Sequence, residues 1–409
     1  MVHHNTSRVS RPATARDRIL PTWSGILAEI QAEVAKGDPS AFDVVRRKYL
    51  AALAAHAKRN VILYATKWTQ PGDHDPNLTS ITEEDVQGLM EVVHGLPGKD
   101  LDLIIHSPGG SAEAAEAIVH YLRAKFDHIR VIVPHAAMSA ATLVACAANE
   151  IVMGKQSSIG PVDPQYIIAG PAQGQVQAVP AQAILDQFDL AKQECRDPHL
   201  LGAWAPMLGQ YGPALLMQCK NALKLAENLA AEWIRTWMLG ATKGKKAAIK
   251  ARSIAKALRD HKRFKSHARH ISRDQARAIG LVVTDLEGDQ TFQDLVLSVF
   301  HATTLTFDST PAVKIMENQL GKAFVKVHRM VQIPFQMVPA PMMPSPAPPG
   351  GHVPPMGPPQ AAASPAGPIT SGVTLRVPQG PGTGLNVIMG RWPGEETDEE
   401  IQGALNELS

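Results

Sequence analysis

The chain has 409 residues, 44% of them hydrophobic and 19% charged, and its 40 Lys and Arg against 38 Asp and Glu leave a formal net charge of +2. This balance excludes a globally basic nucleic-acid-binding protein, and the length predicts one large domain with appendages, or two domains. The three cysteines show neither a close pair nor metal-ligand spacing, which excludes a disulfide framework or a zinc ribbon and favours a reducing compartment. Because the N-terminus lacks the apolar core of a secretory signal, we expect a cytoplasmic protein.

The first part of the chain has a helical pattern. Apolar residues recur at Ile26, Leu27 and Ile30, and the pattern resumes beyond a break at 37–39. We therefore predict an N-terminal helical extension over 1–54. The main domain, predicted over 55–332, begins with a β-rich run at 61–64, a loop at 67–77 and a helix over 82–93.

Buried strands and helices alternate from residue 99 onward. The predicted strands cover 101–105, 129–133 and 150–153, and the predicted helices cover 111–125 and 138–148. This alternation indicates parallel βαβ units and therefore an α/β fold. The apolar stretch 131–148 is interpreted as a strand and a helix rather than a membrane span, because a Pro-His pair interrupts it and much of it is alanine.

The second half of the main domain is predicted to be mostly helical. Helical patterns cover 183–240 and 313–331, and a short helix starting at Ser272 leads into a strand at 281–283. Between 243 and 269 there are eleven Lys or Arg residues and a single acid. We interpret this basic stretch as a solvated helical face, with substrate capture or binding to an anionic surface as the alternative.

The composition changes sharply after residue 333. Between Pro334 and Pro381 lie fifteen of the 32 prolines and one charged residue, so we predict a disordered linker over 333–386. The last segment, 387–409, is acidic and contains Trp392 and three apolar residues at helical spacing, Ile401, Leu405 and Leu408. That composition is typical of a peptide that docks on a protein partner.

Two segments of the main domain carry candidate chemistry. Ser107-Pro108-Gly109-Gly110 forms a predicted turn between a strand and a helix, where exposed backbone N–H groups would suit an oxyanion. Ser139 follows the next predicted strand and is flanked by alanines and a methionine. A nucleophile on a sharp turn needs such small neighbours so that a substrate can reach its hydroxyl.

The order of these pieces resembles the Clp protease and crotonase superfamily, and more closely the serine dehydrogenase proteinase family, which is related to signal-peptide peptidase A. The resemblance covers roughly residues 55–300. It is carried by the stretches HSPGGSAEAAEAI, VIVPHAAMSAATLVACAANEIVM and IGPVDPQ, and more weakly by SHARHISRDQARAIGL at 266–281.

This resemblance implies an α/β fold of the Clp/crotonase type, a stacked ββα superhelix, and a serine peptidase acting on a peptide or an unfolded protein. Ser139 would be the nucleophile, and Gly109 and Gly110 would supply the oxyanion-hole amides. The resemblance also implies a homo-oligomer, no cofactor and no metal.

The general base is less clear in the sequence. No histidine occurs between Ser139 and His199, and Pro164 stands where a Clp-type histidine is expected. Lys192 lies 53 residues after the serine, which fits the lysine of signal-peptide peptidases. A lysine desolvated beside the serine can lose its proton. We therefore rank Lys192 first and His267, in the weakly matching stretch, second.

Other residues near these segments receive simpler interpretations. Lys220 and Lys224 are further candidates for the base, whereas Asp163 is expected to fix a turn and His135 to be a core histidine. Two other functions stay open. One is a crotonase-like acyl-CoA enzyme with Glu113 as its nearest acid, and the other is an inactive peptidase scaffold that binds a partner through its tail.

Overall fold

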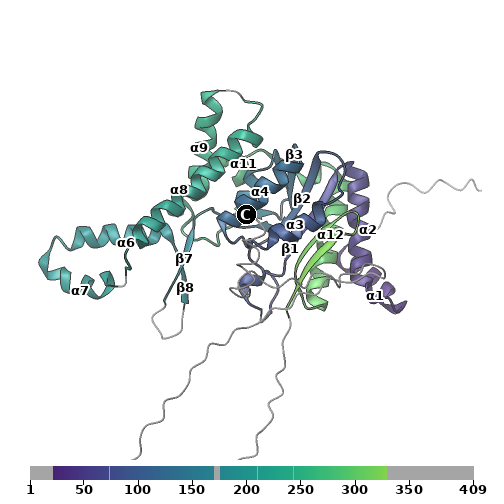
Figure 1. Cartoon of the computed structure of the whole chain (residues 1–409), viewed down its shortest axis with the longest axis horizontal. Helices are drawn as coiled ribbons and strands as arrows, with labels where there is room; N and C mark the ends of the chain where they lie inside the picture. The colour runs from purple at the N-terminus through teal and green to yellow at the C-terminus, as the bar shows by residue number, and fades with distance from the viewer. Residues whose placement is uncertain (1–21, 73, 170–175, 210, 243, 329–409) are drawn as a thin grey trace, which may run out of the picture. The chain divides into compact units, whose positions relative to one another are not determined.

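The computed structural model describes residues 22–72, 74–169, 176–209, 211–242 and 244–328 (Figure 1). All of them belong to the first of the chain's two units, residues 1–346. The predicted linker 333–386 and the predicted docking segment 387–409 lie outside the described residues.

A seven-stranded sheet forms the centre of the described part, in the order β10-β5-β3-β2-β1-β11-β12. The first five strands are parallel neighbours, and β11 and β12 follow as antiparallel neighbours. The bounds are β10 (Val283–Asp285), β5 (Glu150–Met153), β3 (His128–Val133), β2 (Asp100–His106), β1 (Asn60–Thr66), β11 (Ala312–Asn318) and β12 (Ala323–Val327).

Helices cover both faces of this sheet, which explains why its central strands are apolar on both sides. Neighbouring residues of β1 divide between the two faces, since Ile62 packs into one core and Leu63 into the other. The first core contains side chains of α3 (Asp85–Val93), α4 (Ala112–Lys125), α5 (Ala140–Cys146), α8 (Leu215–Trp233) and α9 (Lys245–Arg259). The second core contains side chains of α2 (Ala41–Ala57) and α12 (Gln290–Ser309).

The described part of the predicted N-terminal extension packs against the late helix α12. Helix α1 (Trp23–Ala35) inserts Ile26 and Ile30 beside Val45 of α2 and Leu305 of α12. Thr22 caps α1 by accepting a hydrogen bond from the N–H of Gly25. The two N-terminal helices therefore cover part of the sheet domain in this structure.

Short strands extend the fold beside the main sheet. β4 (Ala136–Ala137), β6 (Ser158–Ile159) and β9 (Ile271–Ser272) form a three-stranded sheet, and β7 (Gln165–Ala169) pairs with β8 (Val176–Pro180) as a hairpin. The hairpin leads into α6 (Ala181–Glu194) and α7 (Pro198–Leu208), which Figure 1 shows set apart from the seven-stranded sheet. The shorter helices α10 (His261–Phe264) and α11 (Arg273–Ile279) precede β10.

The structure corrects one predicted element and adds several, of which the hairpin β7–β8 and the helix α12 are the largest. Residues 313–331 were expected to be helical, but the strands β11 and β12 occupy 312–327. Every residue of β11 is buried, including Lys314 and Glu317, and this removes the polar alternation that marks a half-exposed strand. The hairpin β7–β8 and the helix α12 were not predicted.

The other predicted strands and helices of the first half are confirmed within a few residues. In particular, the apolar stretch 131–148 contains the end of β3, the short strand β4 and the helix α5, and so is no single span. No helix among the described residues is long and apolar enough to cross a membrane.

Candidate active site

The Gly109-Gly110 turn lies between β2 and α4 and is held tightly against two other segments. Gly109 has φ 97°, and a Cβ atom there would lie 2.6 Å from the Met138 carbonyl oxygen and 2.7 Å from the Cβ of Ser139. A Cβ atom on Gly110 would lie 2.3 Å from the carbonyl oxygen of Ile81. Only glycine fits at these positions, because no side chain can enter contacts that close.

Hydrogen bonds fix the direction of the two amide groups. The N–H of Ile81 donates to the Gly109 carbonyl at 2.7 Å, so the adjoining Gly110 N–H, which is trans to that carbonyl, points away from Ile81. The Gly109 N–H instead donates to the Ser107 hydroxyl at 3.2 Å. The two glycines therefore differ: the Gly109 amide is engaged within the turn, whereas the structure gives the Gly110 amide no acceptor among the described residues.

Ser139 sits at a strained turn between β4 and α5. Its backbone has φ 52° and ψ −118°, a conformation that non-glycine residues rarely adopt. Thr142 stabilises this turn, since its hydroxyl lies 2.8 Å from the carbonyl oxygen of Ala137, to which it can donate, and accepts a hydrogen bond from the N–H of Gly160 at 3.0 Å. Backbone strain at a half-buried serine whose neighbours are buried is a common feature of functional sites.

A cavity of about 680 Å³ joins Ser139 to both glycines. Its walls include Gln165, Tyr166 and Ile167 of the hairpin β7–β8, and Ala222, Leu225 and Ala226 of α8. The hairpin that the sequence did not reveal therefore forms one wall of the site. Asp163 and His267 also line this cavity, and both come from segments distant in sequence from the glycine turn.

Asp163 and His267 form a hydrogen-bonded pair. The Nδ1 atom of His267 lies 2.6 Å from Oδ1 of Asp163, whose side chain is 1% exposed. Because a carboxylate only accepts hydrogen bonds, Nδ1 carries the proton, and the Nε2 atom of the neutral ring keeps a basic lone pair. Oδ2 of the same carboxylate lies 3.2 Å from Nδ1 of His261.

Comparisons with known proteins show which family this chain is similar to. Residues 44–196 match the model of a protein family described as ClpP-like SDH-type serine proteinases. Over this stretch the chain is similar to that family. The resemblance stated from the sequence and the expected Clp/crotonase-type α/β fold are thereby confirmed.

Two uncharacterized proteins of Methanocaldococcus jannaschii are similar to parts of the chain. MJ0137 is 48% identical over 86 residues, which are 21% of this chain and 30% of that protein. MJ1495 is 33% identical over 179 residues, which are 44% of this chain and 51% of that protein. The chain thus spans about a third and about half of the lengths of these two relatives.

A solved structure, a mutant form of the 1510-N membrane-bound stomatin-specific protease, aligns with 16% identity over 50% of this chain and 75% of that one. The TM-score is 0.29, which is too low to indicate a shared fold. The family match and the order of the strands indicate the fold.

In this ClpP-like domain the lysine candidates lie away from Ser139. Lys192 is on α6 with its side chain 65% exposed, and it pairs with Asp189 at 3.3 Å. It does not line the cavity of Ser139. Lys220 and Lys224 project from α8 into a different hollow, beside Arg252. The desolvation that a lysine base requires is therefore not found at Lys192, and the structure brings His267 to the cavity instead.

The remaining candidates are also placed by the structure. His135 stacks on His106 with ring centroids 5.4 Å apart and does not line the cavity, as expected for a core histidine. Glu113 lines the cavity near its glycine turn. Asp163 does more than fix a turn, because it holds the imidazole of His267. A sequence signal for this pairing existed, since both residues fall within stretches that carry the family resemblance.

A buried ion pair supports the segment that holds the glycine turn. Lys314, fully buried on β11, lies 2.7 Å from Oδ1 of Asp85 and donates to the carbonyl oxygen of Ser80 at 2.7 Å. Asp85 in turn accepts a hydrogen bond from the N–H of Thr82. Burial lowers the pKa of Lys314 to about 8, against the opposing effect of Asp85. This pair thus anchors both neighbours of Ile81, which contacts the glycine turn.

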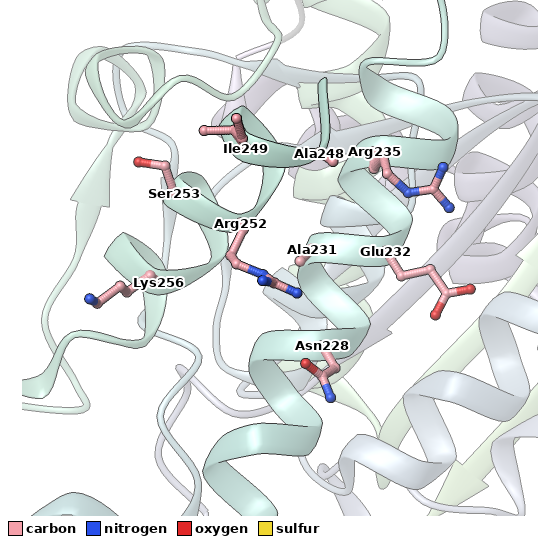
Figure 2. A pocket seen from close by; sticks show the side chains of 9 residues that line it. All are labelled: Asn228, Ala231, Glu232, Arg235, Ala248, Ile249, Arg252, Ser253 and Lys256. Carbon is pink, nitrogen blue, oxygen red and sulfur yellow. The ribbon is translucent and has the colours of Figure 1, made fainter. Parts of the chain in front are cut away.

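A further hollow, distinct from the cavity of Ser139 and from the hollow beside Lys220 and Lys224, lies between α8 and α9 (Figure 2). Figure 2 shows Arg252 reaching from α9 toward Ala231 of α8, with Arg235 and Glu232 on the far side. The lining residues include no histidine, and Glu232 is their single carboxylate. Ser253, the only serine among these lining residues, therefore has no hydrogen-bonded histidine and aspartate beside it like those at the cavity of Ser139.

Proposed function

We propose that this chain hydrolyses peptide bonds by an acyl-enzyme route, with Ser139 as the nucleophile, His267 as the general base and Asp163 as the residue that orients the base. The observation that carries the proposal is the 2.6 Å contact between Asp163 and His267 at the wall of the cavity that contains Ser139. A serine, a base and an orienting carboxylate are recognised by their geometry and not by their order in the chain.

The first step uses the strained turn. The Oγ atom of Ser139 attacks the carbonyl carbon of the peptide bond, and its proton passes to Nε2 of His267. Asp163 favours the imidazolium that forms, because its carboxylate accepts the Nδ1 proton in a buried setting. The base then gives its proton to the leaving amine, and a water molecule, activated by the same histidine, releases the acyl group.

The oxyanion requires donors that are not already engaged. We assign the Gly110 N–H, which points away from Ile81, and the N–H of Ala140, the first residue of α5. The first N–H groups of a helix have no partner inside the helix. Gly109 contributes by its missing side chain, because a Cβ there would lie 2.8 Å from the Ala140 nitrogen. This refines the expectation that both glycine amides bind the oxyanion.

A fluorophosphonate probe tests the proposal, because its phosphorus accepts the oxygen of an activated serine and loses fluoride. We expect the wild-type chain to be labelled at Ser139 and the Ser139→Ala variant to be unlabelled. The matched control is Ser253→Ala, which removes an exposed serine of the other hollow and should leave labelling unchanged. Wild-type protein that stays unlabelled would contradict the peptidase and favour the acyl-CoA enzyme or the inactive scaffold.

Several further expectations are proposals as well. The resemblance implies a peptide or unfolded protein as substrate and assembly into a homo-oligomer. The cysteine pattern favours a cytoplasmic location, and the composition of 387–409 favours a protein partner for that segment. Light scattering of the purified full chain tests the assembly, and a truncation at residue 386 tests the partner.

A further inference from the structure

We propose that His261 is a positioning residue of this site, which holds the carboxylate of Asp163 in the orientation that aligns His267. The inference rests on the proposed function, since it assigns a role within the same set of residues. The proposed site would then contain a second histidine, His261, beside the nucleophile, the base and the carboxylate that orients the base. His261 itself does not line the cavity, so it acts through Asp163.

The geometry consists of two histidines on one carboxylate. Nδ1 of His267 lies 2.6 Å from Oδ1 of Asp163, and Nδ1 of His261 lies 3.2 Å from Oδ2. The Asp163 side chain is 1% exposed, whereas that of His261 is 18% exposed. Each carboxylate oxygen therefore has its own imidazole donor.

A buried carboxylate needs donors on both of its oxygens. An ionised group that loses water without gaining partners is strongly destabilised. Without His261, Oδ2 would have no donor among the described side chains, and the carboxylate could rotate about its terminal bond toward other donors. Oδ1 would then leave the direction of His267. A displacement of about 1 Å in a catalytic group can cost about 100-fold in rate.

The local sequence is built to bring both histidines to Asp163. Asp260 caps the helix α10, which begins at His261, by accepting a hydrogen bond from the Arg263 N–H. Phe264 is buried and anchors the helix, and Lys265 follows with φ 66°, which reverses the chain direction. This one-turn helix and its left-handed end place two residues that are six apart in sequence on the same carboxylate.

The test compares variants that keep or remove the donor at position 261. His261→Phe keeps an aromatic ring and removes the donor, whereas His261→Asn keeps an N–H donor close to the position of Nδ1. Lys262→Ala is the matched control, because it changes the next residue of the same helix, whose side chain is 73% exposed. Fluorophosphonate labelling of the full chain is measured against probe concentration, which separates the maximal rate from half-saturation.

We expect His261→Phe to lower the maximal labelling rate by about 10- to 100-fold while half-saturation changes less than about twofold. His261→Asn should recover most of the rate, and Lys262→Ala should match the wild type. A wild-type rate in His261→Phe would overturn the inference. So would equal losses in the Phe and Asn variants, because the hydrogen bond would then not be the cause. Melting temperatures of both variants show whether a loss comes from unfolding. If the Phe variant unfolds, His261→Leu, which also lacks the donor, takes its place in the comparison with His261→Asn.

The same experiment separates this inference from the proposed function. If Ser139→Ala and His267→Ala abolish labelling while His261→Phe does not, only the role of His261 fails. If the wild-type chain is not labelled at all, the proposed function itself fails.

Discussion

The two stretches of chain that carry the candidate bases differ in what surrounds their side chains. Lys192 pairs with Asp189 on α6, and both side chains are 65% exposed. His267 also pairs with an aspartate, but Asp163 is buried and borders the cavity of Ser139. A carboxylate in water contributes little to its partner, whereas a buried one fixes the partner's position and favours its charged form. With His267 as the proposed base, the burial of its aspartate partner, and not its spacing from Ser139 in the sequence, is what sets it apart from Lys192.

The largest effect is expected from removing His267, the proposed base, whose aspartate partner is buried. His267→Ala should lower hydrolysis and labelling by about 10²- to 10⁴-fold, which is the usual contribution of a general base. Asp163→Asn should fall within the same range, because the base loses its orienting acceptor. Labelling rates and hydrolysis of fluorescent casein measure both variants. Full activity in His267→Ala would remove the histidine from the mechanism.

The second prediction concerns Lys314, which is fully buried in its ion pair, whereas the side chain of Lys192 is 65% exposed. Lys314→Met should destabilise the chain by about 3–5 kcal/mol, because it leaves the buried Asp85 with only the more distant Lys326, 3.6 Å away, as a cation. Urea unfolding measures the change. Lys36→Met is the control, because Lys36 forms an exposed pair with Glu33, and its midpoint should stay unchanged. Equal midpoints for both variants would contradict the anchoring role of the Lys314–Asp85 pair.

A third prediction concerns a histidine that is buried without a carboxylate. Burial, and the nearby His135, lower the pKa of His106 from 6.5 to about 3. Between these values the unfolded chain binds a proton that the folded chain does not, so the folded state loses stability as pH falls from 6.5 toward 3. The slope from this one group reaches about 1.4 kcal/mol per pH unit.

Urea unfolding at pH 7, 5 and 4 measures this loss. His106→Phe keeps the ring in the cluster with Trp68 and Phe300 and should show a shallower dependence on pH. His120→Phe, an exposed change on α4, should keep the wild-type dependence. If His106→Phe also keeps the wild-type dependence, the buried neutral histidine is not a source of acid sensitivity.

The local parts of the site were predictable from the sequence, because short-range patterns determine them. The strand before Gly109, the cap at Ser111 and the turn at Ser139 all follow from neighbouring residues, and each lies where it was expected. The pairing of Asp163 with His267 was not predictable in this way. It joins residues 104 positions apart, and their approach depends on how α9 and α10 pack.

The wall formed by β7–β8 was missed for a related reason. Exposed and half-buried residues alternate along β7, but one exposed position holds an apolar residue, Ile167, so the hydrophobicity of the sequence does not alternate as it usually does in a strand. The strand β11 was missed because its charged residues are buried in ion pairs with partners far along the chain. In both cases tertiary contacts, rather than local preference, decide the structure.

The smallest effect is expected at Lys192, whose side chain and aspartate partner are both exposed. Lys192→Ala removes an exposed side chain and an exposed ion pair, so labelling and hydrolysis should stay within about twofold of the wild type. The variant is measured beside His267→Ala with the same probe and the same casein substrate. If Lys192→Ala lost activity by orders of magnitude while His267→Ala kept it, a lysine base would be required. Helix α6 would then have to move so that Lys192 enters the cavity, and the contrast between exposed and buried partners would fail as a guide to the base.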